Sequence, residues 1–453
     1  MQVPMSYAAH TGRILALGLP LIGGHLAQFA IGMTDTVMLG WYGVAPLAAQ
    51  TLAASYFFVF FMLGAGFALA VMPLVAAKAA AGDEIGLRRA TRMGLWLSLG
   101  YALAAMPAMW WSEPILRALG QAPQVAADAA VYLRIAGWGL IPALLVMVLK
   151  SYLAGLERTK VVLWITLLAA LTNGLANYAL IFGHWGAPEL GLAGAAIASL
   201  ASQAVSLLAV VIYAARALPH HALFHRLWRG DAGMLARVFR LGVPIGLTML
   251  SEVSLFTASA FMMGWLGTVP LAAHGIVITV ASGSFMVHLG LSNVATIRAG
   301  AAFGLGQALE LARGARAVIL LSLLAALLTI AAFLTVPETI VSAFLAEDDP
   351  ARPEIIATGV SLLAIAALFQ LVDGAQVIAL GLLRGVQDTA VPMIVAVLAY
   401  WAVGIPASYI LGFVFGLGGQ GIWLGLVFGL ACAGVFLMLR FWRRAVHSVA
   451  QAA

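Results

Sequence analysis

Long apolar blocks dominate the pattern of hydrophobic and polar positions along the chain, and short polar turns separate them. The blocks 15–41 and 161–183 each exceed the roughly 20 residues that an α-helix needs to cross the hydrocarbon layer of a bilayer. The breaks, such as GHWGAPELG and AEDDPARPE, are rich in residues typical of turns. The pattern predicts an all-α membrane protein with twelve transmembrane helices over residues 13–40, 46–76, 88–112, 127–150, 160–183, 191–215, 235–263, 270–300, 314–336, 354–382, 389–412 and 419–441.

The composition supports the same class of protein. Apolar residues make up 63% of the 453 residues and charged residues only 9%, whereas a soluble domain carries about a quarter charged residues. So few charges cannot cover a water-facing surface, which excludes a soluble globular protein. The single cysteine, Cys432, excludes an internal disulfide and a thiolate metal cluster.

The basic residues are distributed unevenly about the predicted helices. With the N-terminus in the cytoplasm, every Lys and Arg except Arg117, Arg134 and Arg352 falls in a cytoplasmic segment. This is the positive-inside bias of multi-pass proteins, and it accounts for the net charge of +6 without a nucleic-acid partner. We therefore expect an integral protein of the bacterial inner (plasma) membrane, surrounded by lipid, with both termini cytoplasmic.

The two halves of the chain resemble each other, and the first span matches the seventh without gaps at a shift of 224 residues. The stretch MLGWYGVAPLAAQ, which starts at Met38, matches MMGWLGTVPLAAH, which starts at Met262, and Pro20 matches Pro244. Matches at Pro, Trp and Gly are harder to obtain by chance between apolar helices than matches at Leu or Ala. Six spans per half give both halves the same orientation, so an axis along the membrane normal should relate them, with a site between them near the midplane.

This direct repeat predicts the domain organisation. We expect an N-terminal lobe of six helices over residues 1–217, a cytoplasmic linker over 218–234 and a C-terminal lobe of six helices over 235–453. Two lobes around a central cleft suit transport by alternating access. The histidines of the linker are expected to form part of a solvated basic segment rather than a metal site.

Four stretches carry a resemblance to a known family: MTDTVMLG in the first span, PIGLTMLSE in the seventh, AAHGIV in the eighth and DGAQVIALGLLRGVQDT at the end of the tenth. They resemble the multidrug and toxic-compound extrusion (MATE) family, in particular its NorM-like branch. The resemblance covers essentially the whole chain. It implies two six-helix lobes and secondary active efflux of small hydrophobic or cationic compounds in antiport with Na⁺ or H⁺.

Three acidic residues lie inside predicted spans: Asp35 in the first, Glu252 in the seventh and Asp373 in the tenth. A charged side chain at the bilayer centre costs about 2.5–3.5 kcal/mol on insertion scales. No Lys or Arg is predicted at their depth, so a structural ion pair has no evident partner. A bound cation or a proton would satisfy these acids, and the alternative is a protonated acid hydrogen-bonded within the bundle.

Glu252 and Asp373 both fall in the second half of the chain. The resemblance implies that they lie together in the C-terminal lobe and bind the coupling cation, with Na⁺ as the metal ion if sodium is used. Two neighbouring carboxyl groups titrate as a coupled pair rather than singly. The residue types do not distinguish Na⁺ from H⁺, and we expect no other cofactor.

Asp35 is the acid of the N-terminal lobe. Its expected neighbours are Asn173, Asn177 and Tyr178, because the two asparagines lie one turn apart on one face of a helix. Interhelical hydrogen bonding is the alternative role of these asparagines. Archaeal-type members of the family have an aspartate in this helix, so the asparagines favour the C-terminal pair as the coupling site.

Two further residues are secondary candidates. His274 in the eighth span could join a proton pathway, although a histidine satisfied within the bundle is the alternative. Tyr56 could line the substrate cleft and contact a cation through its ring, although core or lipid packing is the alternative.

Other classes of protein fit the sequence less well than an efflux transporter. A flippase or exporter of a lipid-linked or other amphiphilic metabolite could use a similar two-lobe scaffold, but it would favour several basic residues at mid-membrane depth. A membrane-embedded enzyme would need a catalytic constellation and large loops, and the loops here are short. A passive channel would usually oligomerise, whereas we expect a monomeric transporter that is not an enzyme.

Overall fold

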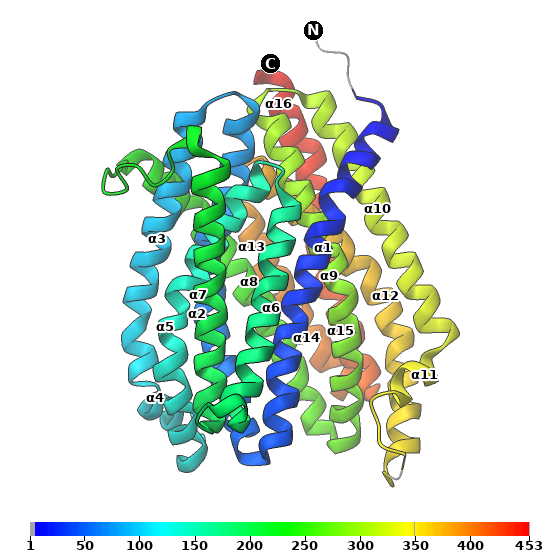
Figure 1. Cartoon of the computed structure of the whole chain (residues 1–453). Helices are drawn as coiled ribbons and strands as arrows, with labels where there is room; N and C mark the ends of the chain where they lie inside the picture. The colour runs from blue at the N-terminus through cyan, green and yellow to red at the C-terminus, as the bar shows by residue number, and fades with distance from the viewer. Residues whose placement is uncertain (1–4, 348, 453) are drawn as a thin grey trace. The chain divides into compact units, whose positions relative to one another are not determined.

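The computed structural model describes residues 5–347 and 349–452. Within these residues, twelve helical segments are long and apolar enough to cross a membrane, and each overlaps one predicted span. They are α1 (Tyr7–Tyr42), α2 (Val44–Ala80), α3 (Glu84–Trp110), α5 (Pro123–Gly155), α6 (Thr159–Phe182), α7 (Gly191–Ala217), α8 (Ala232–Leu266), α9 (Thr268–Gly304), α10 (Ala308–Thr335), α12 (Arg352–Gly385), the run Ala390–Val414 and the run Gly418–Gln451 (Figure 1).

Several helices are longer than a membrane crossing requires. Helix α9 has 37 residues, which corresponds to roughly 55 Å at 1.5 Å per residue, whereas the hydrocarbon layer is about 30 Å thick. These helices are therefore tilted or extend into water. Two short helices, α4 (Ser112–Ala118) and α11 (Pro337–Ser342), lie between the long ones.

The chain forms two compact units. Unit 2 comprises Gly23–Gly246, and unit 1 comprises Met1–Ile22 together with Leu247–Ala453. The chain passes from one unit to the other within α1 and within α8, near the repeat-related Pro20 and Pro244. Unit boundaries therefore lie inside helices, and the lobe boundaries at 217 and 235 remain a prediction from the repeat.

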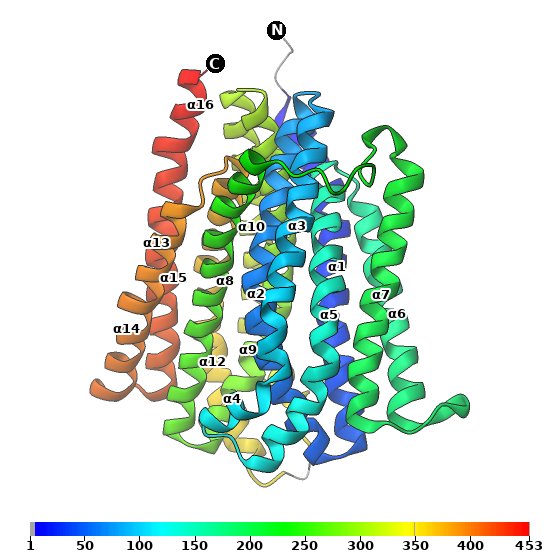
Figure 2. The same ribbon diagram turned by 90° about the vertical axis from the view of Figure 1, so that its left-hand side faces the viewer.

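Polar contacts tie the start of α1 to unit 1. The backbone N–H of Met5 donates a hydrogen bond to Oε1 of Glu310 at 2.8 Å, and Nε2 of His10 lies 3.3 Å from Oε2 of the same carboxylate. Within unit 1, α1 begins and α16 (Val446–Ala452) ends at the same end (Figures 1 and 2).

In unit 2, helices α2, α3, α5, α6 and α7 run side by side (Figure 2). Gly155 allows α5 to approach α2, because a Cβ atom there would lie only 2.8 Å from the Val75 side chain. The turn from α2 to α3 is stabilised by Asp83, which accepts a hydrogen bond from the N–H of Gly86 at 2.8 Å and pairs with Lys78 at 2.8 Å. These contacts lower the pKa of the Asp83 carboxyl group, the Lys78 ammonium being the larger cause.

In unit 1, α9 and α12 pack closely. Oγ of Ser292 donates a hydrogen bond to the carbonyl of Val377 at 2.7 Å, and Oγ1 of Thr296 donates to the carbonyl of Gly381 at 2.9 Å. Small residues let helix backbones approach within a membrane, and side-chain hydroxyls then bond across the interface. This packing fixes α12, which carries Asp373.

The eleventh span is not a continuous α-helix. It consists of α13 (Ala390–Leu398), a π-helical turn (Ala399–Gly404), α14 (Ile405–Tyr409) and a second π-helical turn (Ile410–Val414). Pro406 has no N–H to donate and its ring crowds the carbonyl four residues earlier, which favours a wider turn before it. The last span similarly continues from α15 (Gly418–Arg440) through a π-helical turn into α16.

Candidate cation-binding sites

Helix α12 carries three buried polar side chains at intervals of three residues, along one side of the helix. Gln370, Asp373 and Gln376 are each at most 1% exposed. Nε2 of Gln376 donates a hydrogen bond to the hydroxyl of Tyr400 at 2.6 Å, and Tyr400 is buried in the first π-helical turn. The polar strip therefore faces the interior of unit 1 and not the surrounding lipid.

Glu252 on α8 lies within electrostatic range of Asp373, and both residues belong to unit 1. Oε1 of Glu252 and Oδ1 of Asp373 are buried without a hydrogen-bond partner among the described residues. An unsatisfied buried acceptor costs roughly 1–3 kcal/mol, and more when it is charged. The structure thus brings the two acids together with oxygen lone pairs available to a cation.

The expectation that no basic side chain reaches the depth of these acids is wrong for Glu252. Arg384, in the last turn of α12, lies within electrostatic range of Glu252. The predicted span stopped at residue 382, whereas α12 continues to Gly385, and a long arginine side chain reaches several ångströms from its backbone. Asp373 has no cation within that range among the described residues, so Arg384 offsets one of the two carboxylates.

Sequence reasoning also missed the neutral members of this group. Gln370 and Gln376 stand three residues before and after Asp373, a regular spacing that could have indicated a polar helix face. Both amide atoms of Gln370 and Oε1 of Gln376 are buried without a hydrogen-bond partner in the described part of the chain. Tyr400 carried no such signal, because its position depends on the π-helical turn.

In unit 2, neutral donors surround Asp35. Nδ2 of Asn177 donates a hydrogen bond to Oδ1 of Asp35 at 2.5 Å, and it lies 3.1 Å from Oδ1 of Asn173. Oγ of Ser199 on α7 lies 3.5 Å from Oδ2 of Asp35. Both carboxylate oxygens therefore have partners, and the two asparagines of α6 lie beside Asp35.

Tyr178 is not brought to Asp35. It follows Asn177 directly and so lies about 100° further round α6; it is 40% exposed and stacks on His184 with ring centroids 4.2 Å apart. Tyr132 on α5, which the sequence did not single out, lies within electrostatic range of Asp35 instead.

The two secondary candidates tie helices together within their units. The hydroxyl of Tyr56 on α2 donates a hydrogen bond to the carbonyl of Ala108 on α3 at 2.9 Å, and its ring lies 5.1 Å from that of Phe60. Nε1 of Trp423 on α15 donates to Nδ1 of His274 on α9 at 3.1 Å, and both rings are buried. Each residue therefore has a packing role.

A further basic residue lies within the helices of unit 2. Nζ of Lys150 on α5 donates a hydrogen bond to Oγ1 of Thr166 on α6 at 2.8 Å. The predicted span placed Lys150 at its cytoplasmic end, but α5 continues for five more residues to Gly155.

The two acidic sites differ in what they can bind. Both carboxylate oxygens of Asp35 accept hydrogen bonds, although Oδ1 of the neighbouring Asn177 has no partner among the described residues. The group formed by Glu252 and Asp373 presents several buried oxygen atoms without a hydrogen-bond donor in the same part of the chain, two of them on carboxylates. Carboxylate and amide oxygens are the ligands that hard cations prefer. The site in unit 1 therefore has the chemistry to hold Na⁺ or a proton.

Twelve spanning helices in two compact units and buried carboxyl groups define an integral multi-pass membrane protein of the transporter class. The sequence profile of the family described as MatE matches residues 20–179 and again residues 244–410. The chain belongs to the MatE family, which confirms the resemblance to MATE transporters. Members of this family are transporters, so the chain is not an enzyme.

Curated relatives and solved structures support the family and the fold. The chain is 44% identical over 420 residues to "Probable multidrug resistance protein NorM" of Rhizobium meliloti, covering 92% of this chain and 90% of the relative. It is 42% identical over 420 residues to the protein of the same name from Agrobacterium fabrum, with the same coverage. These relatives agree with the predicted NorM-like branch.

Two solved structures share the two-lobed fold. A eukaryotic MATE transporter, AtDTX14, superposes with a TM-score of 0.85 at 17% identity, covering 98% of this chain and 99% of the other. An outward-facing multidrug resistance MATE family transporter superposes with a TM-score of 0.87 at 19% identity, covering 97% and 96%. At this identity the similarity establishes the fold alone.

Proposed function

We propose that the protein is a secondary active efflux transporter. It exports small hydrophobic or cationic compounds from the cytoplasm across the bacterial inner membrane, in antiport with Na⁺ or H⁺. The names of the relatives, which describe multidrug resistance proteins, support the substrate class. The distribution of basic residues supports cytoplasmic termini.

The observation that carries the coupling mechanism is the pair of unpartnered carboxylate oxygens on Glu252 and Asp373. Two buried carboxylates in electrostatic range of each other are unfavourable unless a positive species lies between them or one is protonated. A mobile cation removes this penalty when the site is closed to water. A cationic substrate that enters the same region can replace the ion.

The charge of the site suggests a stoichiometry. With Glu252 and Asp373 ionised and Arg384 protonated, the group carries one net negative charge. One monovalent cation neutralises it. We therefore propose that one Na⁺ or H⁺ re-enters for each monovalent cationic substrate exported.

Movement between inward-facing and outward-facing states needs flexible connections. The chain crosses between its two units inside α1 and α8, near Pro20 and Pro244. Proline interrupts the hydrogen-bond ladder of a helix and allows it to bend. Bending at these two places would support alternating access. The membrane potential supplies the energy for this movement, because one elementary charge that crosses 100 mV releases about 2.3 kcal/mol.

Efflux of ethidium from vesicles tests the proposal. We expect a pure inward Na⁺ gradient or a pure inward proton gradient to drive efflux by the parent protein, and Glu252→Gln or Asp373→Asn to abolish it. Glu354→Gln is the matched control, because Glu354 is an exposed acid in the first turn of α12. Parent-like efflux by both site variants would overturn the assignment of the coupling site to unit 1.

A further inference from the structure

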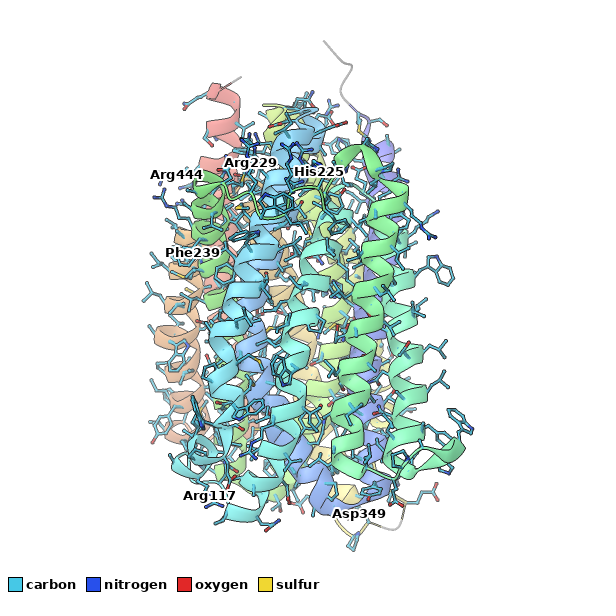
Figure 3. All side chains as sticks on the ribbon, turned by 60° about the vertical axis from the view of Figure 1, so that its left-hand side comes forward. Arg117, His225, Arg229, Phe239, Asp349 and Arg444 are labelled. Atoms are coloured by element: carbon cyan, nitrogen blue, oxygen red, sulfur yellow. The ribbon has the colours of Figure 1, made fainter. Side chains whose placement is uncertain are left out.

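A cavity lined by arginines lies at the end of unit 2 where the linker meets α3. Its volume is about 400 Å³, within the range of small-molecule sites. Figure 3 shows His225 and Arg229 at this end of unit 2, opposite Arg117. The basic residues that line the cavity are Arg88, Arg89, Arg92, His225, Arg226 and Arg229.

Arg92 holds the linker in place against α3. Its Nε donates a hydrogen bond to the carbonyl of Leu223 at 2.7 Å, and its Nη2 donates to the carbonyls of Ala222, at 2.7 Å, and His225. Ala222 and Arg226 have φ angles of 44° and 58°, in the left-handed region that costs about 1–2 kcal/mol for a residue with a side chain. The linker is therefore an ordered segment that forms one wall of the cavity, rather than a flexible connection.

The positive charge of the cavity is mostly unneutralised. Asp231 supplies the one carboxylate of the lining, and it is engaged already, because Oδ2 lies 3.5 Å from Nη1 of Arg89 and Oδ1 accepts a hydrogen bond from the N–H of Met234 at 3.0 Å. Nε of the half-buried Arg88 has no hydrogen-bond partner among the described residues. This donor and the exposed guanidinium group of Arg229 are available to an anion.

We infer that this cavity binds the phosphate group of an anionic ligand, as a site separate from the proposed transport pathway and independent of it. Arginine donates two parallel hydrogen bonds to phosphate oxygens, and several guanidinium groups around one cavity favour a phosphate over a monovalent halide. The phosphate can come from an anionic phospholipid headgroup or from a soluble phosphate compound.

Features beside the cavity match the lipid source. Trp228 in the linker is 76% exposed, and exposed tryptophans are typical of the membrane–water interface. Nε1 of Trp96 on α3 donates a hydrogen bond to the carbonyl of Leu227 at 2.8 Å, which fixes the adjacent turn. Basic pockets on the cytoplasmic side of membrane helices bind the headgroups of anionic lipids.

A triple variant, Arg88→Gln with Arg226→Gln and Arg229→Gln, removes three cavity charges and leaves the bonds of Arg92 intact. The matched control neutralises Arg158, Lys160 and Arg216 by the same change to Gln; these are exposed basic residues at the same end of unit 2 and outside the cavity. Equal melting temperatures without added anion would show that both variants fold. The single variant Arg229→Gln serves if the triple variant does not fold.

Two binding measurements on the purified full-length protein distinguish the sources. Native mass spectrometry reports retention of cardiolipin against phosphatidylethanolamine, and melting temperature reports binding of inorganic phosphate against chloride at equal ionic strength. We expect a loss of affinity of about fivefold for each arginine removed, or roughly a hundredfold in the triple variant, and no loss in the control.

Each outcome decides the inference. Selective cardiolipin retention that only the triple variant loses assigns the site to a lipid headgroup. Stabilisation by inorganic phosphate alone, lost in the triple variant only, assigns it to a soluble phosphate compound. The inference is overturned if the parent prefers neither cardiolipin nor phosphate, or if the control loses affinity as much as the triple variant.

Discussion

Asp35 and Asp373 both carry a carboxyl group among buried helices, but their surroundings differ. Asp35 accepts hydrogen bonds from Asn177 and Ser199, whereas Oδ1 of Asp373 has no such donor among the described residues. A carboxylate that is already satisfied by neutral donors gains less from a bound cation. The environment of each acid, rather than its presence in a span, therefore supports the proposal that the site in unit 1 holds the coupling cation.

Replacing each aspartate by asparagine separates the two roles. We expect the Asp35→Asn variant to keep an ethidium efflux rate at least about ten times that of the Asp373→Asn variant. The reason is that the amide of Asn at position 35 can keep hydrogen bonds to α6 and α7. Initial efflux rates under one imposed gradient, at equal protein levels, measure the difference. Equal losses in the two variants would assign a coupling role to Asp35 as well.

His221 lies in the linker, outside the membrane-spanning helices. Its Nδ1 lies 2.5 Å from the hydroxyl of Tyr152, and burial lowers the pKa of His221 below its ordinary value of 6.5. The charge of His220 lowers this pKa further, and Glu84 raises it. The folded linker therefore favours neutral His221.

The stability of the protein should depend on pH through this residue. Below pH 6.5, His221 is protonated more readily in the unfolded chain than in the folded chain. The contribution of His221 to stability is therefore complete above pH 6.5 and decreases as the pH falls below this value. We expect the parent to melt at a lower temperature at about pH 5 than at about pH 7, and His221→Gln to show a smaller difference. His184→Gln, at an exposed site, is the control. If the melting temperatures at the two pH values differ as much in His221→Gln as in His184→Gln, the role of His221 is refuted.

At the scale of the helix, the contact between α9 and α12 fixes the position of Asp373. A Cβ atom at Gly381 would lie 2.5 Å from the carbonyl oxygen of Ser292, so the backbones could not approach as they do. Gly275 lies on α9, the helix of Ser292, and a Cβ atom at Gly275 would meet open space. The two glycines provide a matched pair for measuring this packing.

Gly381→Ala should lower stability by about 1–3 kcal/mol, because overpacking forces the helices apart. Gly275→Ala should be neutral or slightly stabilising, since alanine favours the helix over glycine. Melting temperatures of the purified variants in one detergent measure both effects. Equal melting temperatures for the two variants would show that the α9–α12 contact is more plastic than its geometry indicates.

Helices were the most predictable elements, because a span needs only enough consecutive apolar residues and a break at each end. All twelve are confirmed, although α5 and α12 extend beyond the predicted ends at 150 and 382. Hydropathy locates the end of the apolar run and not the end of the helix, since a helix can continue into water with polar residues. Arg384 was misplaced for this reason.

In the candidate site, the two acids were predictable from the sequence, and the two glutamines carried a weaker signal in their spacing. Glu252 and Asp373 could be singled out because ionisable groups are expensive within a bilayer. Tyr400 meets Gln376 from within a π-helical turn that precedes Pro406, a local distortion that the apolar pattern does not reveal. Tyr400 can therefore be identified only from the three-dimensional packing.

At the scale of the whole molecule, the orientation in the membrane is a prediction from the charge distribution. Within unit 1 the start of α1 and the end of α16 lie at one end, and Figure 3 shows Arg444 at the opposite end from Asp349. All Lys and Arg residues except Arg117, Arg134 and Arg352 fall in the predicted cytoplasmic segments, which agrees with the positive-inside rule.

Cysteine labelling tests this orientation. In a Cys432→Ser background, Ser448→Cys should react with a membrane-impermeant thiol reagent only in inverted vesicles, and Ala346→Cys only in intact cells. Both positions are exposed. Ser448 lies in α16, four residues after Arg444, and Ala346 lies three residues before Asp349, and Figure 3 shows Arg444 and Asp349 at opposite ends of unit 1. The reverse pattern would place both termini outside and would reverse the proposed direction of transport.

The central claim is that Glu252 and Asp373 together hold one mobile cation that a cationic substrate displaces. The most direct measurement is the number of Na⁺ or H⁺ ions released when the purified protein binds tetraphenylphosphonium, followed with a sodium-selective electrode and a pH indicator in weak buffer. We predict about one ion released per bound tetraphenylphosphonium in the parent, as the net charge of the site requires, and none in Glu252→Gln combined with Asp373→Asn. The same release in that double variant, or none in the parent, would contradict the claim.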